Sequence, residues 1–134
     1  MAVRTHGAGL NHETRSLLAH LRKNRPENRV LGQKPEVVKA QAHTMVSRIL
    51  AASRLRLADS NQYVWFAQDV AAALSVGQGE MLAYELEAVL HRWLVFGLEP
   101  KTVQLLLRVL LRDVAGIDVE PEAAHGKPET ADTG

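Results

Sequence analysis

The sequence contains no cysteine, few aromatic residues and no long apolar run. The absence of cysteine excludes disulfide bonds, thiolate metal ligands and a cysteine nucleophile, and it fits a reducing compartment. Phe, Trp and Tyr make up only 4% of the 134 residues, whereas Ala, Val and Leu are abundant, which favours helix packing over a sheet. The longest uncharged apolar stretch, residues 93–98, is too short to span a membrane, and the N-terminus lacks the apolar core of a secretory signal. We therefore expect a soluble, cytoplasmic protein.

Recognisable catalytic and metal-binding motifs are also missing. There is no glycine-rich phosphate loop, no nucleophile elbow and no ordered set of Ser, His and Asp. The six histidines include no pair four residues apart, and Glu87 with His91 has the spacing of an ordinary surface pair on a helix. We therefore predict no catalytic residues, no cofactor and no metal site.

Charge is separated along the chain, although the net charge is only +1. Up to Arg56 there are eleven Lys or Arg and three acids, which gives +8, whereas the remainder has five basic and twelve acidic residues, which gives −7. Such asymmetry indicates a polyanionic partner or head-to-tail contact between copies of the chain. The alternative is that the basic face is solvated and only balances the acidic half.

Apolar residues recur at helical spacing and predict five helices. These helices begin at or near His12, Pro35, Asp59, Ser75 and Pro100. Asn11 is a good N-cap for the first, residues 12–24, which Pro26 stops, and Pro35 suits the first position of the second. Capping-box spacing sets the third and fourth starts, through Asp59 with Gln62 and Ser75 with Gln78. Gly116 fits a left-handed end to the fifth.

The expected fold is all-α, a compact bundle of about five helices spanning residues 10–117. Residues 1–9 have no periodicity and are expected to form a flexible basic arm, and residues 118–134 are expected to form a disordered acidic tail. The tail contains five acids and one Lys, so it could fold back on the basic arm and compete with an anionic partner.

The fifth predicted helix, residues 101–115, is apolar around most of its circumference. Its polar residues fall on one narrow line, formed by Lys101, Gln104, Arg108 and Arg112. A helix of this kind must be surrounded by other apolar groups. Either the other four helices enclose it, or part of its face is an oligomer interface, for which Leu106, Val109 and Leu110 are the central candidates.

Residues 69–86 match the helix-turn-helix pattern. Its apolar positions, expected to be buried, are Val70, Leu74, Val76, Met81 and Tyr84. In the helix predicted to follow the turn, the main apolar stripe consists of Leu82, Leu86, Val89, Leu90, Trp93 and Leu94. The exposed positions of this helix have a net negative charge, which opposes docking on DNA, so we interpret the segment as two core helices joined by a tight turn.

The basic half supplies candidate phosphate-binding or partner-binding residues. These are Arg15, Arg22, Lys23, Arg25, Arg29 and Lys34. The first 60 residues contain no aromatic side chain, so any nucleic-acid binding should depend on phosphate contacts and weaken with salt. The only aromatic cluster includes Trp65 and Phe66, with Trp93 as a possible neighbour, and it fills core or lines a ligand pocket.

These observations rank three classes of function. The leading hypothesis is a non-catalytic interaction module that acts as an assembly, adaptor or regulatory subunit, either homo-oligomeric or bound to a helical protein partner. The alternative is a nucleic-acid-binding protein that uses its basic half. The third is a small-ligand binder or enzyme with its pocket at the aromatic cluster.

Overall fold

The computed structural model describes residues 10–24, 26–53 and 60–118, and within these ranges the chain is helical without strands. The helices are α2 (His12–Asn24), α3 (Pro35–Ala52), α4 (Ser60–Val76), α5 (Gly79–Val95) and α6 (Pro100–Val109), which continues into a π-helical turn, η1 (Leu110–Val114). The predicted all-α bundle is confirmed. The predicted arm at residues 1–9 and nearly all of the predicted tail lie outside the described residues. None of the described helices is long and apolar enough to cross a bilayer.

Most helix ends follow the local signals in the sequence. The Asn11 side chain accepts a hydrogen bond from the Thr14 backbone N–H at 2.8 Å, as expected of an N-cap. Pro35 occupies the first turn of α3. The Glu99 carboxylate caps α6 by accepting from the backbone of Thr102 at 2.9 Å.

The start of α5 differs from the prediction. The Ser75 hydroxyl donates to the carbonyl of Ala72 inside α4, at 2.9 Å, and is therefore not a cap for α5. Gln78 precedes the helix without a side-chain capping bond, so the capping box predicted at this turn is wrong. The other predicted capping box depends on Asp59, which lies outside the described residues.

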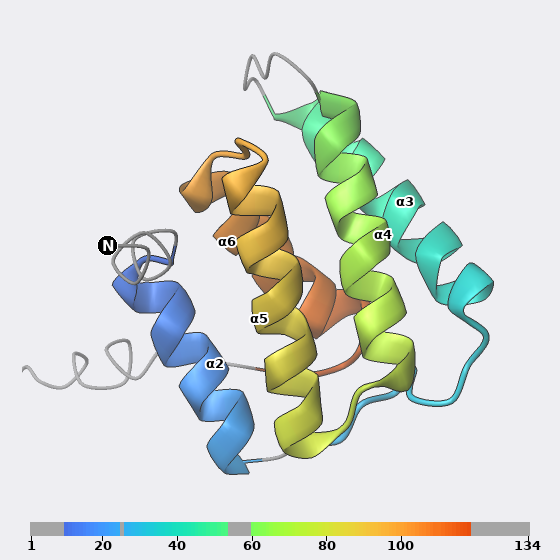
Figure 1. The fold of residues 1–134 in the computed structure, drawn as a ribbon. Coiled ribbons are helices and arrows are strands. Elements are labelled where there is room, and N and C mark those ends of the chain that lie inside the picture. Colours follow the sequence, from blue (N-terminus) through green and yellow to red (C-terminus); the bar gives the residue numbers. More distant parts are fainter. Residues whose placement is uncertain (1–9, 25, 54–59, 119–134) are drawn as a thin grey trace, which may run out of the picture.

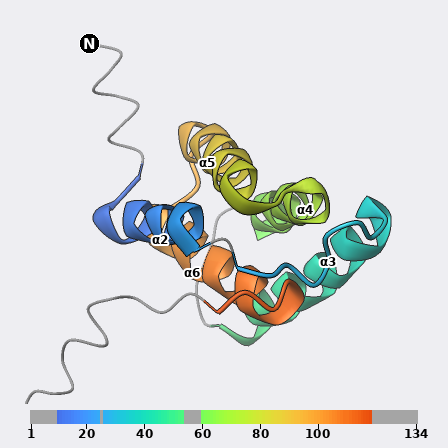
Figure 2. The ribbon, with the colours of Figure 1, turned by 90° about the horizontal axis from the view of Figure 1, so that it is seen from below.

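The helices surround α6. Figure 1 shows α3 beside α4 on one flank, α5 next to α4, and α2 on the far side of α5. Seen from below, α6 lies between α2 and α3 (Figure 2). The first of the two arrangements left open by the sequence is therefore the one observed, because helices of the same chain enclose α6.

This enclosure corrects the predicted oligomer interface. Leu106 and Leu110 are 1% and 0% exposed within a single chain, so their side chains are not available to a second subunit. Val109 is half-buried, and Leu105 is the exposed leucine of α6. The helix also changes to π geometry at Leu110, where the wider turn lets the apolar side chains of the last turn all face the core.

Helix α2 is attached to α6 by a buried polar contact. Gln104, on the polar line of the fifth predicted helix, is only 9% exposed. Its side chain accepts from Asn11 at 3.0 Å and donates to Glu13 at 2.9 Å. The start of α2 is thus fixed to α6 by a buried amide whose oxygen and nitrogen each have a partner on α2 or its N-cap.

Candidate interaction groove

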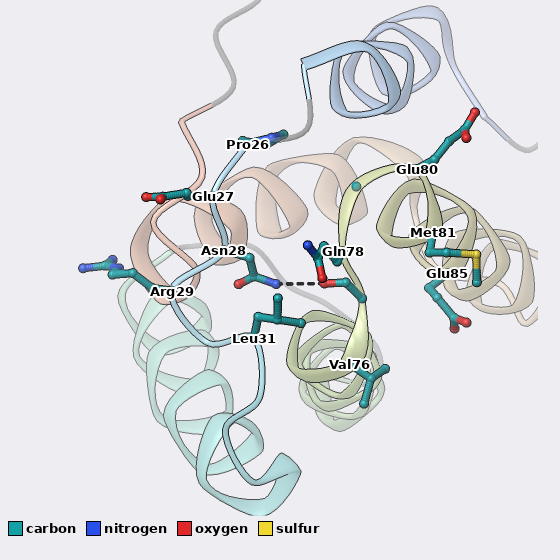
Figure 3. A pocket seen from close by; sticks show the side chains of 12 residues that line it. Pro26, Glu27, Asn28, Arg29, Leu31, Val76, Gln78, Glu80, Met81 and Glu85 are labelled. Carbon is teal, nitrogen blue, oxygen red and sulfur yellow. Dashed lines mark hydrogen bonds between the residues drawn. The ribbon is translucent and has the colours of Figure 1, made fainter.

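A groove of about 850 Å³ lies between the segment that joins α2 to α3 and the turn that joins α4 to α5. We call it the connector groove. Its lining residues are Pro26, Glu27, Asn28, Arg29, Leu31, Val76, Gly77, Gln78, Gly79, Glu80, Met81 and Glu85 (Figure 3). One wall is therefore non-helical connector and the other is formed by the end of α4 and the first turns of α5.

The connector wall is held in place by hydrogen bonds. The Asn28 side chain donates to the carbonyls of Leu74 and Gly77, at 2.6 and 3.3 Å, and so joins the connector to the end of α4 (Figure 3). The backbone N–H of Gly32 donates to the carbonyl of Ser75 at 3.0 Å. These bonds position the groove before any partner is present.

The opposite wall depends on a close approach at Gly77. A Cβ atom at this position would lie 2.8 Å from the carbonyl oxygen of Ala73 and 2.9 Å from a methyl carbon of Leu82. No side chain fits there without moving the backbone. The absence of a side chain at Gly77 thus allows the sharp change of direction that brings the first turn of α5 to the groove.

Three apolar side chains of the groove are exposed to solvent. Leu31 is 38% exposed, Val76 66% and Met81 59%. The helix-turn-helix pattern placed Val76, Met81 and Tyr84 in the core, and that part of the prediction is wrong because Tyr84 is 54% exposed as well. Its two other apolar positions are fully buried, and α4 and α5 are joined by a tight turn as expected.

The rim of the groove is acidic. Glu27 lies on the connector and points to the same side as Arg29, away from α5, whereas Glu80 and Glu85 lie on α5 (Figure 3). All three are exposed, and no ion pair within the described ranges involves them. Arg29 is the one cation in the lining, and its side chain points away from Glu80 and Glu85 in Figure 3.

The predicted phosphate-binding residues have different environments. Arg15, Lys23, Arg29 and Lys34 are exposed, and Arg25 lies outside the described residues. Arg22 is half-buried, forms an ion pair with Glu87 at 2.5 Å and lies 5.1 Å from the centre of the Tyr84 ring. Its charge is therefore matched by an acid from the other half of the chain.

The aromatic cluster does not line the groove. Phe66 is fully buried, so it fills core, which is one of the two alternatives for this cluster. Trp65 is 55% exposed, and the indole N–H of Trp93 donates to Asp69 at 2.7 Å. These residues lie toward the start of α4 and the end of α5, whereas the connector groove lies where α4 ends and α5 begins.

Within the part of the chain that the structure describes, no group of three or more His, Asp or Glu side chains is placed to hold a metal ion. Comparison with protein families, characterised proteins and solved structures finds no match to this chain.

Proposed function

We propose that this chain is a non-catalytic interaction module that binds a segment of another protein in the connector groove. The observation that supports the proposal is the exposure of Leu31, Val76 and Met81 along one hollow whose walls are fixed by hydrogen bonds. Exposed apolar side chains that gather beside a hollow and have a polar rim are typical of a protein-binding surface. Methionine adds adaptability, because its unbranched side chain adjusts to different partner surfaces.

A protein segment fits this groove better than a small molecule. Pockets for small ligands enclose most of the ligand and place a few polar groups around it. Here the apolar side chains are open to solvent, and the carboxylates stand at the rim. Such a surface favours a longer ligand that covers the apolar residues and extends beyond them.

A random peptide library displayed on phage and selected against the full chain tests this function. Selected peptides should lose binding to a Met81→Gln variant and keep it with a Leu105→Gln variant. Leu105 is a matched control because it is also an exposed apolar residue of a helix, 52% exposed, and lies outside the groove. The absence of selected binders, or equal binding to both variants, would contradict the proposal.

A second candidate function is phosphate-directed nucleic-acid binding. Lys23, Arg29 and Lys34 are exposed at the end of α2, in the connector and at the start of α3, and Arg29 points away from the groove acids on α5. Binding of a DNA or RNA duplex should weaken steeply with salt and fall in a Lys23→Glu, Lys34→Glu double variant. A gel shift that does not respond to salt would exclude this mode.

A further inference from the structure

We infer that the partner segment of the connector groove is a basic amphipathic helix. This inference rests on the proposed function and specifies the chemistry of the occupant. Three features of the groove support it: the backbone of the connector, the charge of the rim and the position of the apolar side chains.

The connector offers little backbone for pairing with an extended peptide. The backbone N–H groups of five successive residues, 29–33, all donate within the chain. The N–H of Arg29 donates to the carbonyl of Ala115, and that of Gly32 to the carbonyl of Ser75. The other three donate within the connector: Val30 to the Asn28 side chain, Leu31 to the Asn28 carbonyl and Gln33 to the Val30 carbonyl. A peptide strand gains its affinity from free main-chain groups along an edge. Because these N–H donors are already used, an extended peptide finds few free donors along the connector, which favours recognition through side chains, as in a helix bound in a groove.

The rim selects for positive charge. Glu80 and Glu85 give the α5 wall two carboxylates, whereas on the connector wall Glu27 and Arg29 point to the same side, away from α5 (Figure 3). Since the one cation of the lining, Arg29, is directed away from the two acids of α5, a cationic partner gains attraction and an acidic one meets repulsion. A segment with Lys or Arg beside its apolar stripe, on the side that faces α5, is the complement of this arrangement.

Apolar residues lie on both walls of the groove. Leu31 projects from the connector wall, while Val76 and Met81 belong to the helical wall (Figure 3). A helix displays residues i, i+3, i+4 and i+7 on one face, so a stripe of that spacing can contact both walls while the flanking positions reach the rim.

Three synthetic peptides of fifteen residues test the inference by fluorescence anisotropy with the full chain. They share leucines at helical spacing and differ at the other positions, which are Lys, Gln or Glu. The Lys peptide should bind at least about tenfold more tightly than the Gln peptide, the Glu peptide should bind least, and the preference should shrink as salt rises. A Lys peptide with a central proline should bind much more weakly, because proline disrupts the helix.

Variants of the rim complete the test. Glu80→Gln should weaken the Lys peptide about two- to fivefold, the Glu80→Gln, Glu85→Gln double variant should weaken it further, and neither should affect the Gln peptide. Glu36→Gln is the matched control, because Glu36 is also an exposed acid in the first turn of a helix but lies outside the groove. It should leave affinity unchanged.

The outcomes separate this inference from the function on which it rests. Equal affinity for the Lys and Gln peptides, an equal effect of Glu36→Gln and Glu80→Gln, or full binding of the proline peptide would overturn the inference, while groove binding itself would stand. If no peptide binds, or if Met81→Gln leaves every affinity unchanged, the proposed function is overturned as well.

Discussion

Replacing Leu110 with alanine should strongly destabilise the chain, and the loss should not depend on protein concentration. Leu110 is fully buried, and removing the side chain of a buried leucine costs about 2–5 kcal/mol because contacts are lost and a cavity remains. Leu105→Ala, in the same helix, should cost less than about 1 kcal/mol, because the leucine is 52% exposed and alanine favours helix. The two variants differ in burial and not in chemistry.

Urea denaturation followed by circular dichroism measures both variants. With a slope of about 1–3 kcal/mol per molar urea, a loss of 3 kcal/mol lowers the midpoint by about 1–3 M, whereas the control should fall by less than about 1 M. If Leu110 instead stabilised an oligomer, each tenfold rise in protein concentration would restore about 1.4 kcal/mol. A midpoint that rises with concentration, or equal losses in the two variants, would refute the burial argument.

Three further substitutions test contacts that fix the groove and its surroundings. Arg22→Glu should lower the free energy of unfolding by about 1–2 kcal/mol, because it places a second carboxylate beside Glu87 and removes the cation from the Tyr84 ring. The control variant Lys23→Glu should change that free energy by less than about 0.5 kcal/mol. Gln104→Ala should cost about 1–3 kcal/mol and speed hydrogen exchange in the first turns of α2; unchanged exchange would contradict its anchoring role. Gly77→Ala should lower the free energy of unfolding by about 1–3 kcal/mol, since the added Cβ meets a backbone oxygen at 2.8 Å, and a neutral effect would show that the turn can relax.

The fold could be predicted to the extent that it depends on local signals. The first helix, the starts of α3 and α6 and the left-handed glycine after η1 follow from Asn11, Pro35, Pro100 and Gly116, whose preferences act within a few residues. The role of Gln104 could not be predicted, because its hydrogen-bond partners lie more than 90 residues earlier in the chain. Tertiary packing decides whether a polar line on a helix meets water or another helix.

The groove was not predicted because the helix-turn-helix pattern assigned two of its apolar residues, Val76 and Met81, to the core. A signal against that assignment was nevertheless present: Met81 and Tyr84 fall off the main apolar stripe of α5, whose leading members Leu82 and Leu86 are buried. An apolar side chain outside the buried stripe of its own helix is a candidate for binding a partner. The pairing of this helix face with the connector, by contrast, depends on Asn28 and could not be read from periodicity.

The charge separation along the chain acquires a different meaning once the contacts are known. Arg22 comes from the basic half and binds Glu87 of the acidic half, so part of the asymmetry stabilises the packing of α2 on α5. On the same helix, Glu80 and Glu85 form no ion pair within the described ranges. The attraction between the two halves therefore neutralises one part of α5 and leaves the part at the groove negative. Because the acids at the groove have no basic partner within the described ranges, the positive charge in the proposed complex comes from the partner and not from the basic half of this chain.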